Sequence, residues 1–176
     1  RFENEWPLKR TAYTKYYLHS GGRANTKNGD GSLSIDPPRD EPPDRFVYDP
    51  DNPVPSAPDG SVFDDFKNYP VDHSPLETRE DILVYSTAPL NRDIEVTGPL
   101  EIILHAASSA VNTDFTGKLL DVHPDGRAIY IRDGIIRASF RNGSIRPGNI
   151  EPGKVYEYHI DLWATSNVFK RGHRIR

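Results

Sequence analysis

Cysteine is absent from this sequence. Its absence excludes disulfide bonds, a thiolate nucleophile and metal sites built from cysteine sulfur. It does not fix a cellular compartment, because proteins of reducing and of oxidising environments both tolerate a lack of cysteine.

Long apolar runs and a basic surface are missing too. No stretch approaches the roughly 18 apolar residues that a membrane-spanning helix needs, and the start has no signal-peptide pattern. Lysine and arginine number 22 against 26 aspartates and glutamates, and the net charge is -4. The two signs are interspersed, whereas a nucleic-acid binder shows a basic patch or stripe. We therefore expect neither a nucleic-acid nor a membrane partner.

Apolar residues are scarce, at 35%, whereas the chain has 16 prolines and 13 glycines. Many of the prolines lie between Pro37 and Pro58. Because proline cannot donate to a sheet ladder, we predict a long loop region over residues 36–75, with at most a short strand at 45–48. The length suits one well-buried domain, so we predict a single β-sandwich domain over residues 1–176.

Short apolar segments follow one another through most of the chain. Gly, Pro, Asn or Asp bounds each of them at a spacing of about ten residues, the rhythm of a sandwich or barrel. The predicted strands are 11–18, 32–35, 81–86, 93–98, 100–108, 115–122, 128–133, 135–140 and 154–163. Apolar and polar residues alternate from Tyr156 to Leu162 and from Leu100 to Ala106, as in half-buried strands. The best short-helix candidate is 64–69, and the predicted fold class is all-β.

The segment "DVHPDGR" at 121–127 holds charged residues and a histidine between two strand patterns. Asp-Gly favours a tight hairpin turn, because its central positions need a positive φ that these residues tolerate. We therefore predict a hairpin tip, with Leu119, Ile129 and Ile131 contributing to the core. "RDG" at 132–134 is predicted to be a second turn or bulge.

Catalytic and metal-binding motifs are missing. No Gly-x-Ser-x-Gly elbow is present to carry a serine nucleophile. The six histidines form no His-x-His or His-x-x-x-His pair that would place two metal ligands on one face. We predict no catalytic residue, no metal and no cofactor, and expect the isolated chain to hydrolyse nothing.

Weaker patterns leave alternatives open. The loops "NTKNGDG" at 25–31 and "DPDNP" at 49–53 carry oxygen ligands of the kind that calcium prefers, but ordinary turns explain the same residues. The carboxylates of "ETRED" at 77–81 suit an acid–base pair or, more simply, a solvated loop. The tyrosine-rich strand faces suit a core or a sugar-stacking surface.

Several segments together go further than these patterns. They are "WPLKRTAYTKYYLHSGG", "YDPDNPVPS", "REDILVYSTAPL", "TDFTGKLLDVHPDGRAIYIRDGIIRASFRN" and "IDLWATSNVFKRGHRIR". In this order they resemble the C-terminal domain of the X-Pro dipeptidyl-peptidase family, which includes cocaine esterase and the α-amino-acid ester hydrolases.

The resemblance implies a jelly-roll β-sandwich that is similar to galactose-binding modules. It implies a non-catalytic role beside α/β-hydrolase and cap domains of the same parent chain, where a Ser-His-Asp triad lies. It also implies that Val62 and Phe63 line the substrate pocket; the alternative is that Phe63 and Phe66 only hold their loop against the sandwich. The family pattern continues past "GHRIR", so we expect a jelly roll truncated at its C-terminus.

Two other roles remain open at this stage. One is a stand-alone carbohydrate-binding β-sandwich, and the other is a dimerisation module. An exposed sheet edge invites pairing with another chain, so a homo-oligomer formed through that edge is a further expectation.

Overall fold

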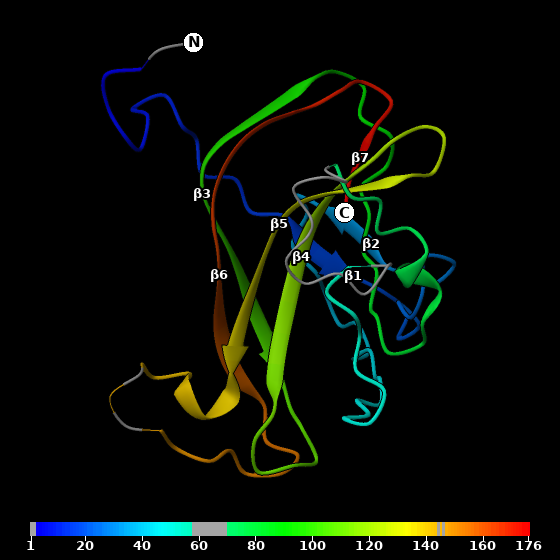
Figure 1. Ribbon diagram of the computed structural model, residues 1–176, viewed down its shortest axis with the longest axis vertical. Helices are drawn as coiled ribbons and strands as arrows, with labels where there is room; N and C mark the ends of the chain where they lie inside the picture. Colours follow the sequence, from blue (N-terminus) through cyan, green and yellow to red (C-terminus); the bar gives the residue numbers. More distant parts are fainter. Residues whose placement is uncertain (1–2, 58–69, 144, 146) are drawn as a thin grey trace. The chain divides into compact units, whose positions relative to one another are not determined.

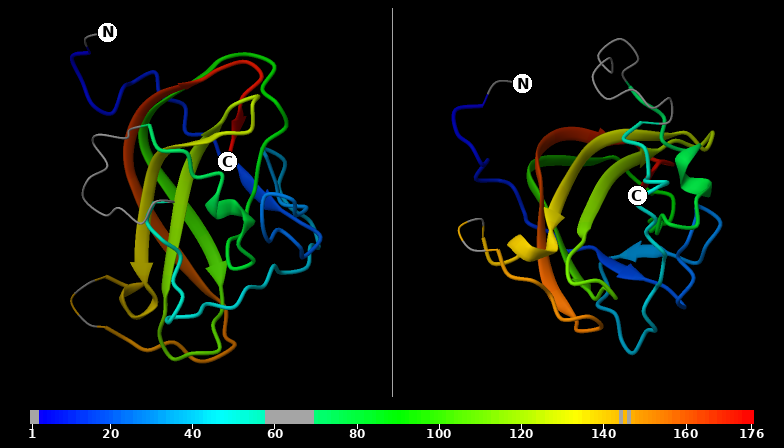
Figure 2. Two further views of the ribbon diagram at one scale, coloured as in Figure 1. Left: turned by 45° about the vertical axis from the view of Figure 1, so that its right-hand side comes forward. Right: turned by 60° about the horizontal axis from the view of Figure 1, so that its bottom comes forward.

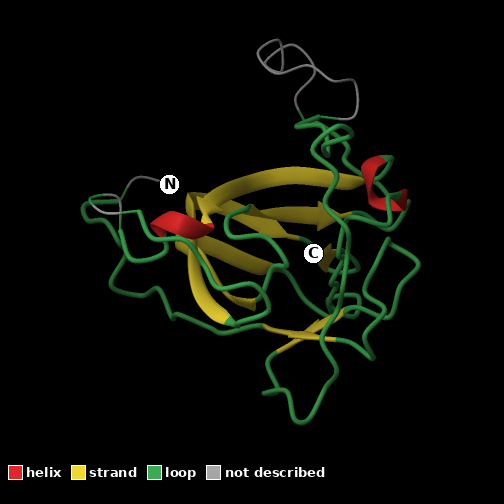
Figure 3. Ribbon diagram, turned by 90° about the horizontal axis from the view of Figure 1, so that it is seen from below, coloured by secondary structure: helices red, strands yellow, loops and turns green. Residues whose placement is uncertain are grey.

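A computed structural model describes residues 3–57, 70–143, 145 and 147–176. Within them the regular structure is almost entirely β (Figures 1 and 3). The strands are β1 (Tyr17–His19), β2 (Ser32–Ser34), β3 (Ile94–Ala106), β4 (Asp114–Val122), β5 (Ala128–Arg137), β6 (Tyr156–Phe169) and β7 (Arg174–Ile175). Two 3-10 helices, η2 (Leu76–Thr78) and η3 (Ala138–Phe140), interrupt the loops. The predicted all-β class is confirmed.

The strands form three small sheets. β1 pairs with β2, β3 pairs with β6, and the third sheet has the order β5-β4-β7. β1 and β2 are antiparallel, as are β4 and β7. The jelly-roll connectivity and the likeness to galactose-binding modules stay predictions. Among the described residues, no helix has both the length and the apolar character needed to cross a membrane.

Two compact units share the chain. The first contains the residues up to Thr11 together with Val96–Leu119 and Ile131–Asn167. The second contains the remaining described residues, and each of the four long strands contributes to both units.

The core of the first unit is built from alternate residues of its strands. Buried and exposed side chains alternate along β6 up to Trp163, as the sequence predicts. The buried members of this core are Phe115, Ala138, Ile150, Tyr158, Ile160 and Leu162. The rings of Phe115 and Tyr158 lie 4.7 Å apart at its centre. The residues predicted to face inward from β3, which are Leu100, Ile102, Leu104 and Ala106, pack against this cluster.

Two predicted strand breaks are absent. β3 runs through Gly98 and Pro99, and β5 runs through residues 132–134, where a turn or bulge was predicted. Among the described residues, β6 is the only strand that pairs with β3, so one side of β3 makes no ladder hydrogen bonds. A proline, which lacks an N–H, is tolerated in such an edge strand. Gly134 fits within β5 because the chain passes close to the Asp161 carbonyl there.

The segment around "HPDG" is a hairpin tip, as predicted (Figure 2). The His123 N–H donates to the Arg127 carbonyl at 2.9 Å, and the Gly126 N–H donates to the His123 carbonyl at 2.9 Å. Gly126 has a φ of 93°, the left-handed conformation that the turn requires. Of the predicted core residues, Ile129 is buried and Leu119 packs against the core of the first unit.

Three predicted strands are shorter or missing. Only the end of 11–18 is strand, because β1 begins at Tyr17. Residues 45–48 form no strand, and 81–86 contribute single bridges at Leu83 and Ser86. Residues 12–16 are all exposed, Tyr13 at 72%, so this part of the segment buries no apolar face. The predicted short helix at 64–69 lies outside the described residues.

The described part of the proline-rich loop is held by polar contacts. The Asp44 carboxylate accepts hydrogen bonds from Ser20 Oγ, from the Ala24 N–H and from Tyr85 Oη. Phe46, in the same loop, is 44% exposed. Residues 36–57 contain no strand, and Asp72 forms a single bridge with Ile129; the extent of the loop region over 36–75 stays a prediction.

Replacing Gly134 with alanine should destabilise the protein by about 1–3 kcal/mol, because overpacking forces the backbone to shift. A β-carbon at Gly134 would lie 2.1 Å from the Asp161 carbonyl oxygen. Urea denaturation measures the effect. Gly148→Ala is the matched control, since a β-carbon there meets nothing within 4 Å. Equal stability of the two variants would contradict the tight approach of the chain to Gly134.

Replacing His159 with glutamine should reduce stability in mildly acidic solution only. Hydrogen bonds to Glu101 and then Glu157 raise the pKa of His159 above its ordinary value of 6.5. A raised folded-state pKa contributes stability that is fully present below the unfolded-state pKa and is lost as pH rises through the folded-state pKa. Denaturation at several pH values should show a larger free energy of unfolding for wild type than for His159→Gln below about pH 6, with the gap closing as the pH rises through the raised pKa of His159. A stability difference that widens with rising pH would refute this prediction. In a Glu101→Gln background, the effect of His159→Gln on stability should be smaller, because the main partner of His159 is removed.

Candidate functional site

The predicted pocket residues Val62 and Phe63 lie outside the described residues. The two loops considered for calcium use their carboxylates for turns. Asp30 accepts the N–H groups of Gly21 and Arg23, and Asp49 accepts the N–H of Asp51. Carboxylates that cap turns in this way explain the loops without an ion.

The segment 77–81 contains no solvated acid–base pair. Glu77 is only 3% exposed and forms a salt bridge with Arg176, so the expectation of a solvated loop is wrong at this residue. Arg79 lies 2.6 Å from Asp81, and its hydrogen bond lowers the pKa of that carboxyl. Both carboxylates therefore serve as partners of arginine in the fold.

Ser34, His19 and Glu41 resemble a serine–histidine–carboxylate triad. Ser34 Oγ lies 3.2 Å from His19 Nε2, and His19 Nδ1 lies 2.7 Å from Glu41 Oε1. However, Nε2 also lies 2.9 Å from the Asp36 carbonyl oxygen, which only accepts hydrogen bonds. The Nε2 atom therefore carries a proton and cannot take one from the serine. The hydrogen bond of Glu41 raises the pKa of His19, which further stabilises the protonated ring.

The sequence search for local histidine pairs missed a cluster at the hairpin. Within the described residues, one group of metal-ligating side chains has ligand atoms within 4.8 Å of one another, and it consists of Asp121, His123 and His173. We call it the aspartate–histidine cluster. His173 Nδ1 lies 2.9 Å from Asp121 Oδ1, and His123 Nε2 lies 3.8 Å from Asp121 Oδ2. The imidazole rings lie 4.3 Å apart, and Asp121 is 7% exposed.

Strand geometry brings these three residues together. Asp121 and His123 are two positions apart at the end of β4, so their side chains point to the same side. β7 pairs antiparallel with β4, with Asp121 opposite Ile175 and Val122 opposite Arg174. The next step of that register places His173 beside His123. The spacing of Asp121 and His123 in the sequence could have suggested that these two lie together. His173 comes close to them only through the pairing of β7 with β4.

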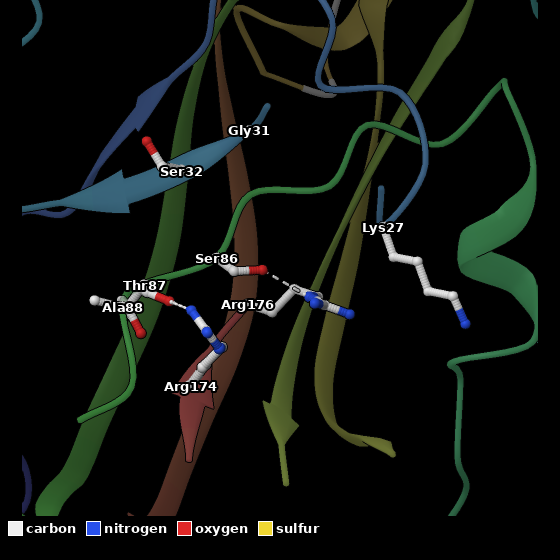
Figure 4. Close-up of a pocket in the computed structure, with 8 residues that line it drawn as sticks. All are labelled: Lys27, Gly31, Ser32, Ser86, Thr87, Ala88, Arg174 and Arg176. Atoms are coloured by element: carbon white, nitrogen blue, oxygen red, sulfur yellow. Dashed lines mark hydrogen bonds between the residues drawn. The ribbon is translucent and has the colours of Figure 1, made fainter. Parts of the chain in front are cut away.

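Two open pockets lie in the second unit. One, of about 480 Å³, is lined in part by His123, Gly172 and Arg174. The other, of about 510 Å³, shares three cationic lining residues with the first, which are Lys27, Arg174 and Arg176. Figure 4 shows the Arg174 and Arg176 guanidinium groups bonded to the Thr87 carbonyl and to Ser86 Oγ. The two arginines of this pocket therefore hold the C-terminal segment that contains β7 to residues 86–87.

A bulge in β6 presents an exposed tryptophan. Trp163 has a φ of 64°, unusual for a bulky residue, and is 76% exposed. The backbone N–H of Trp163 donates to Asp161 Oδ1 at 2.7 Å. Arg132 Nε donates to the Ala164 carbonyl, also at 2.7 Å. Buried positions are even-numbered up to Leu162 and include Thr165 beyond it. An extra residue in one strand produces such a change of face.

Comparisons with known proteins agree with this β-rich structure. Residues 1–176 match the X-Pro dipeptidyl-peptidase C-terminal non-catalytic domain. Cocaine esterase of Rhodococcus sp. (strain MB1 Bresler) is 49% identical over 175 residues, which cover 99% of this chain and 30% of that protein.

Two solved structures are similar as well. An α-amino acid ester hydrolase has a TM-score of 0.78 at 25% identity, covering 91% of this chain and 27% of its own. An aminopeptidase from a marine sediment archaeon (Thaumarchaeota archaeon) has a TM-score of 0.75 at 28% identity, covering 92% of this chain and 28% of its own.

This chain therefore spans less than a third of the length of these relatives. The match over its full length and the identity to cocaine esterase lead to one conclusion. The chain belongs to the family of X-Pro dipeptidyl-peptidase C-terminal non-catalytic domains.

Proposed function

We propose that this domain packs on the α/β-hydrolase and cap domains of a serine hydrolase and helps to shape its substrate cleft. The proposed reaction of that hydrolase is cleavage of carboxylic esters, by serine attack, histidine base catalysis and water attack on the acyl-enzyme. The observation that carries the proposal is the 49% identity to an esterase over 99% of this chain. Peptide bonds are the second candidate, since one similar structure is an aminopeptidase.

The bulge around Trp163 supports a packing role. A non-glycine residue in the left-handed region costs on the order of 1–3 kcal/mol, and such strain concentrates at functional positions. Here the strained residue is also a largely exposed tryptophan, one of the residue types that dominate binding energy at interfaces. We propose that the indole inserts against the catalytic part of the same hydrolase, the part of the relatives that this chain does not span.

Trp163→Asn should lower the thermal stability of the full-length hydrolase without adding backbone strain to this domain. Asparagine tolerates the left-handed backbone, so the bulge keeps its shape while the indole is lost. Loss of an interface anchor costs about 2 kcal/mol or more. We expect a lower unfolding temperature and faster thermal inactivation of the full-length hydrolase.

The matched control is Val155→Asn, because Val155 is also exposed, at 61%, in the segment just before β6. A Trp163→Asn hydrolase that is as thermostable as the control would count against the indole as an anchor. A sugar that protects Trp163 from chemical modification would instead favour the alternative of a carbohydrate-binding module.

The second part of the proposal is that Val62 and Phe63 line the acyl pocket of the hydrolase, as the resemblance to the family implies. In the full-length hydrolase, Phe63→Ala should lower kcat/KM for a bulky aromatic acyl ester by about tenfold, the size expected for one apolar pocket contact. Acetyl esters should be affected much less.

Tyr48→Ala is the control, since Tyr48 is a 57% exposed aromatic residue of the same long loop region. An equal loss for bulky and small acyl groups would show that Phe63 only holds its loop in place. Pairing of two copies through an exposed sheet edge stays a prediction of the sequence.

A further inference from the structure

We propose that the aspartate–histidine cluster binds one zinc ion through Asp121, His123 and His173, with the fourth position open to water. Two imidazole nitrogens and one carboxylate oxygen form a ligand set that zinc accepts in sites with three protein ligands. Calcium and magnesium prefer several oxygen ligands, and the cluster offers one carboxylate. The proposal does not depend on which bond the hydrolase cleaves.

The distances suit a zinc ion. Ligand atoms about 2.1 Å from a tetrahedral zinc lie about 3.4 Å from one another. In the cluster, His173 Nδ1 lies 2.9 Å from Asp121 Oδ1 and His123 Nε2 lies 3.8 Å from Asp121 Oδ2, and the three ligand atoms lie within 4.8 Å of one another. Zinc would replace the hydrogen bond between His173 Nδ1 and Asp121, and the neutral ring would then carry its proton on Nε2, which leaves the Nδ1 lone pair for the metal.

The backbone holds all three ligands before any ion arrives. Asp121 is fixed by the pairing of β4 with β7, and the His123 N–H is bonded to the Arg127 carbonyl at 2.9 Å. The His173 N–H donates to the Lys170 carbonyl at 3.0 Å. Ligands that are already ordered lose little conformational entropy on binding, which favours affinity.

The carboxylate of Asp121 favours a cation at the cluster, against the opposing charge of Lys27, Arg174 and Arg176, which line the pocket beside it. Asp121 is nearly buried, and a buried carboxylate is costly unless a positive group or hydrogen bonds compensate it. Neighbouring arginines are directed to other acceptors, Arg127 to Asp125 and Arg174 to the Thr87 carbonyl. Arg127 Nη2 also lies 3.4 Å from His123 Nδ1; with zinc on Nε2 that nitrogen would carry the ring proton, so the guanidinium would have to turn away from it.

An ion can reach the cluster from solvent. His123 is half-buried and lines the open pocket of about 480 Å³ described above. The open fourth position would face this pocket and hold a water molecule. A zinc ion there would join the β4–β5 hairpin tip to the turn before β7, two segments 50 residues apart in the sequence.

The test uses the full-length hydrolase, stripped of metal with a chelator and dialysed against zinc chloride. Bound zinc is measured by mass spectrometry, and cobalt(II) serves as a spectroscopic probe of tetrahedral coordination. Wild type should bind one zinc ion more per chain than His123→Ala or His173→Ala. Each of these variants should lose at least about 100-fold in zinc affinity, more than the loss of a group that only orients a ligand.

His159→Ala is the matched control. His159 is also a histidine between two carboxylates, Glu101 and Glu157, but it lies on the exposed face of β6. This variant should keep the zinc. Loss of zinc from His159→Ala and not from His123→Ala would overturn the proposal.

Equal zinc content in wild type and His123→Ala, or no tetrahedral cobalt spectrum in wild type, would also overturn it. The cobalt measurement keeps the proposal falsifiable even if a variant fails to fold, because it uses the wild-type protein. Ester hydrolysis by His123→Ala should match wild type, so this outcome is independent of the proposed function.

Discussion

The alternation of apolar and polar side chains along β6 is the constraint on which the core of the first unit depends. Tyr158, Ile160 and Leu162 enter the core from one side of this strand, and Phe115 of β4 packs on Tyr158. A slip by one residue would exchange the faces of the strand and expose all three. The opposite face is therefore fixed as well, which places His159 between its two glutamates and leaves Trp163 in solvent.

The bulge at Trp163 shows how the strand satisfies two demands. Asp161 and Arg132 hold its backbone, and Gly134 leaves room for the approach. The extra residue shifts burial to Thr165 and presents the indole outward. These local bonds stabilise a strained conformation that the core does not need. This strained, exposed residue is the observation on which the proposed contact with the rest of the hydrolase rests.

Polar groups in this domain are mostly used for structure. Ser34, His19 and Glu41 have the order of a triad, yet the Asp36 carbonyl occupies the nitrogen that a base would need. Glu77 is buried against Arg176. The aspartate–histidine cluster differs, because its carboxylate faces two imidazoles beside an open pocket. Similar residue types thus serve different roles, and the neighbouring atoms decide which.

The sequence by itself determined the all-β class, the hairpin at "HPDG" and the inward faces of β3 and β6. These follow from local rules, because strand periodicity and turn chemistry involve residues close together in the chain. The family was also readable, from long stretches such as "TDFTGKLLDVHPDGRAI" and "ATSNVFKRGHRIR". Only the tertiary structure decided that β3 runs through Gly98-Pro99, since tolerance of a proline depends on which side of the strand has a neighbour. It alone brought His173 to Asp121 and His123, and buried Glu77, because strand pairing and burial join residues that no local pattern connects.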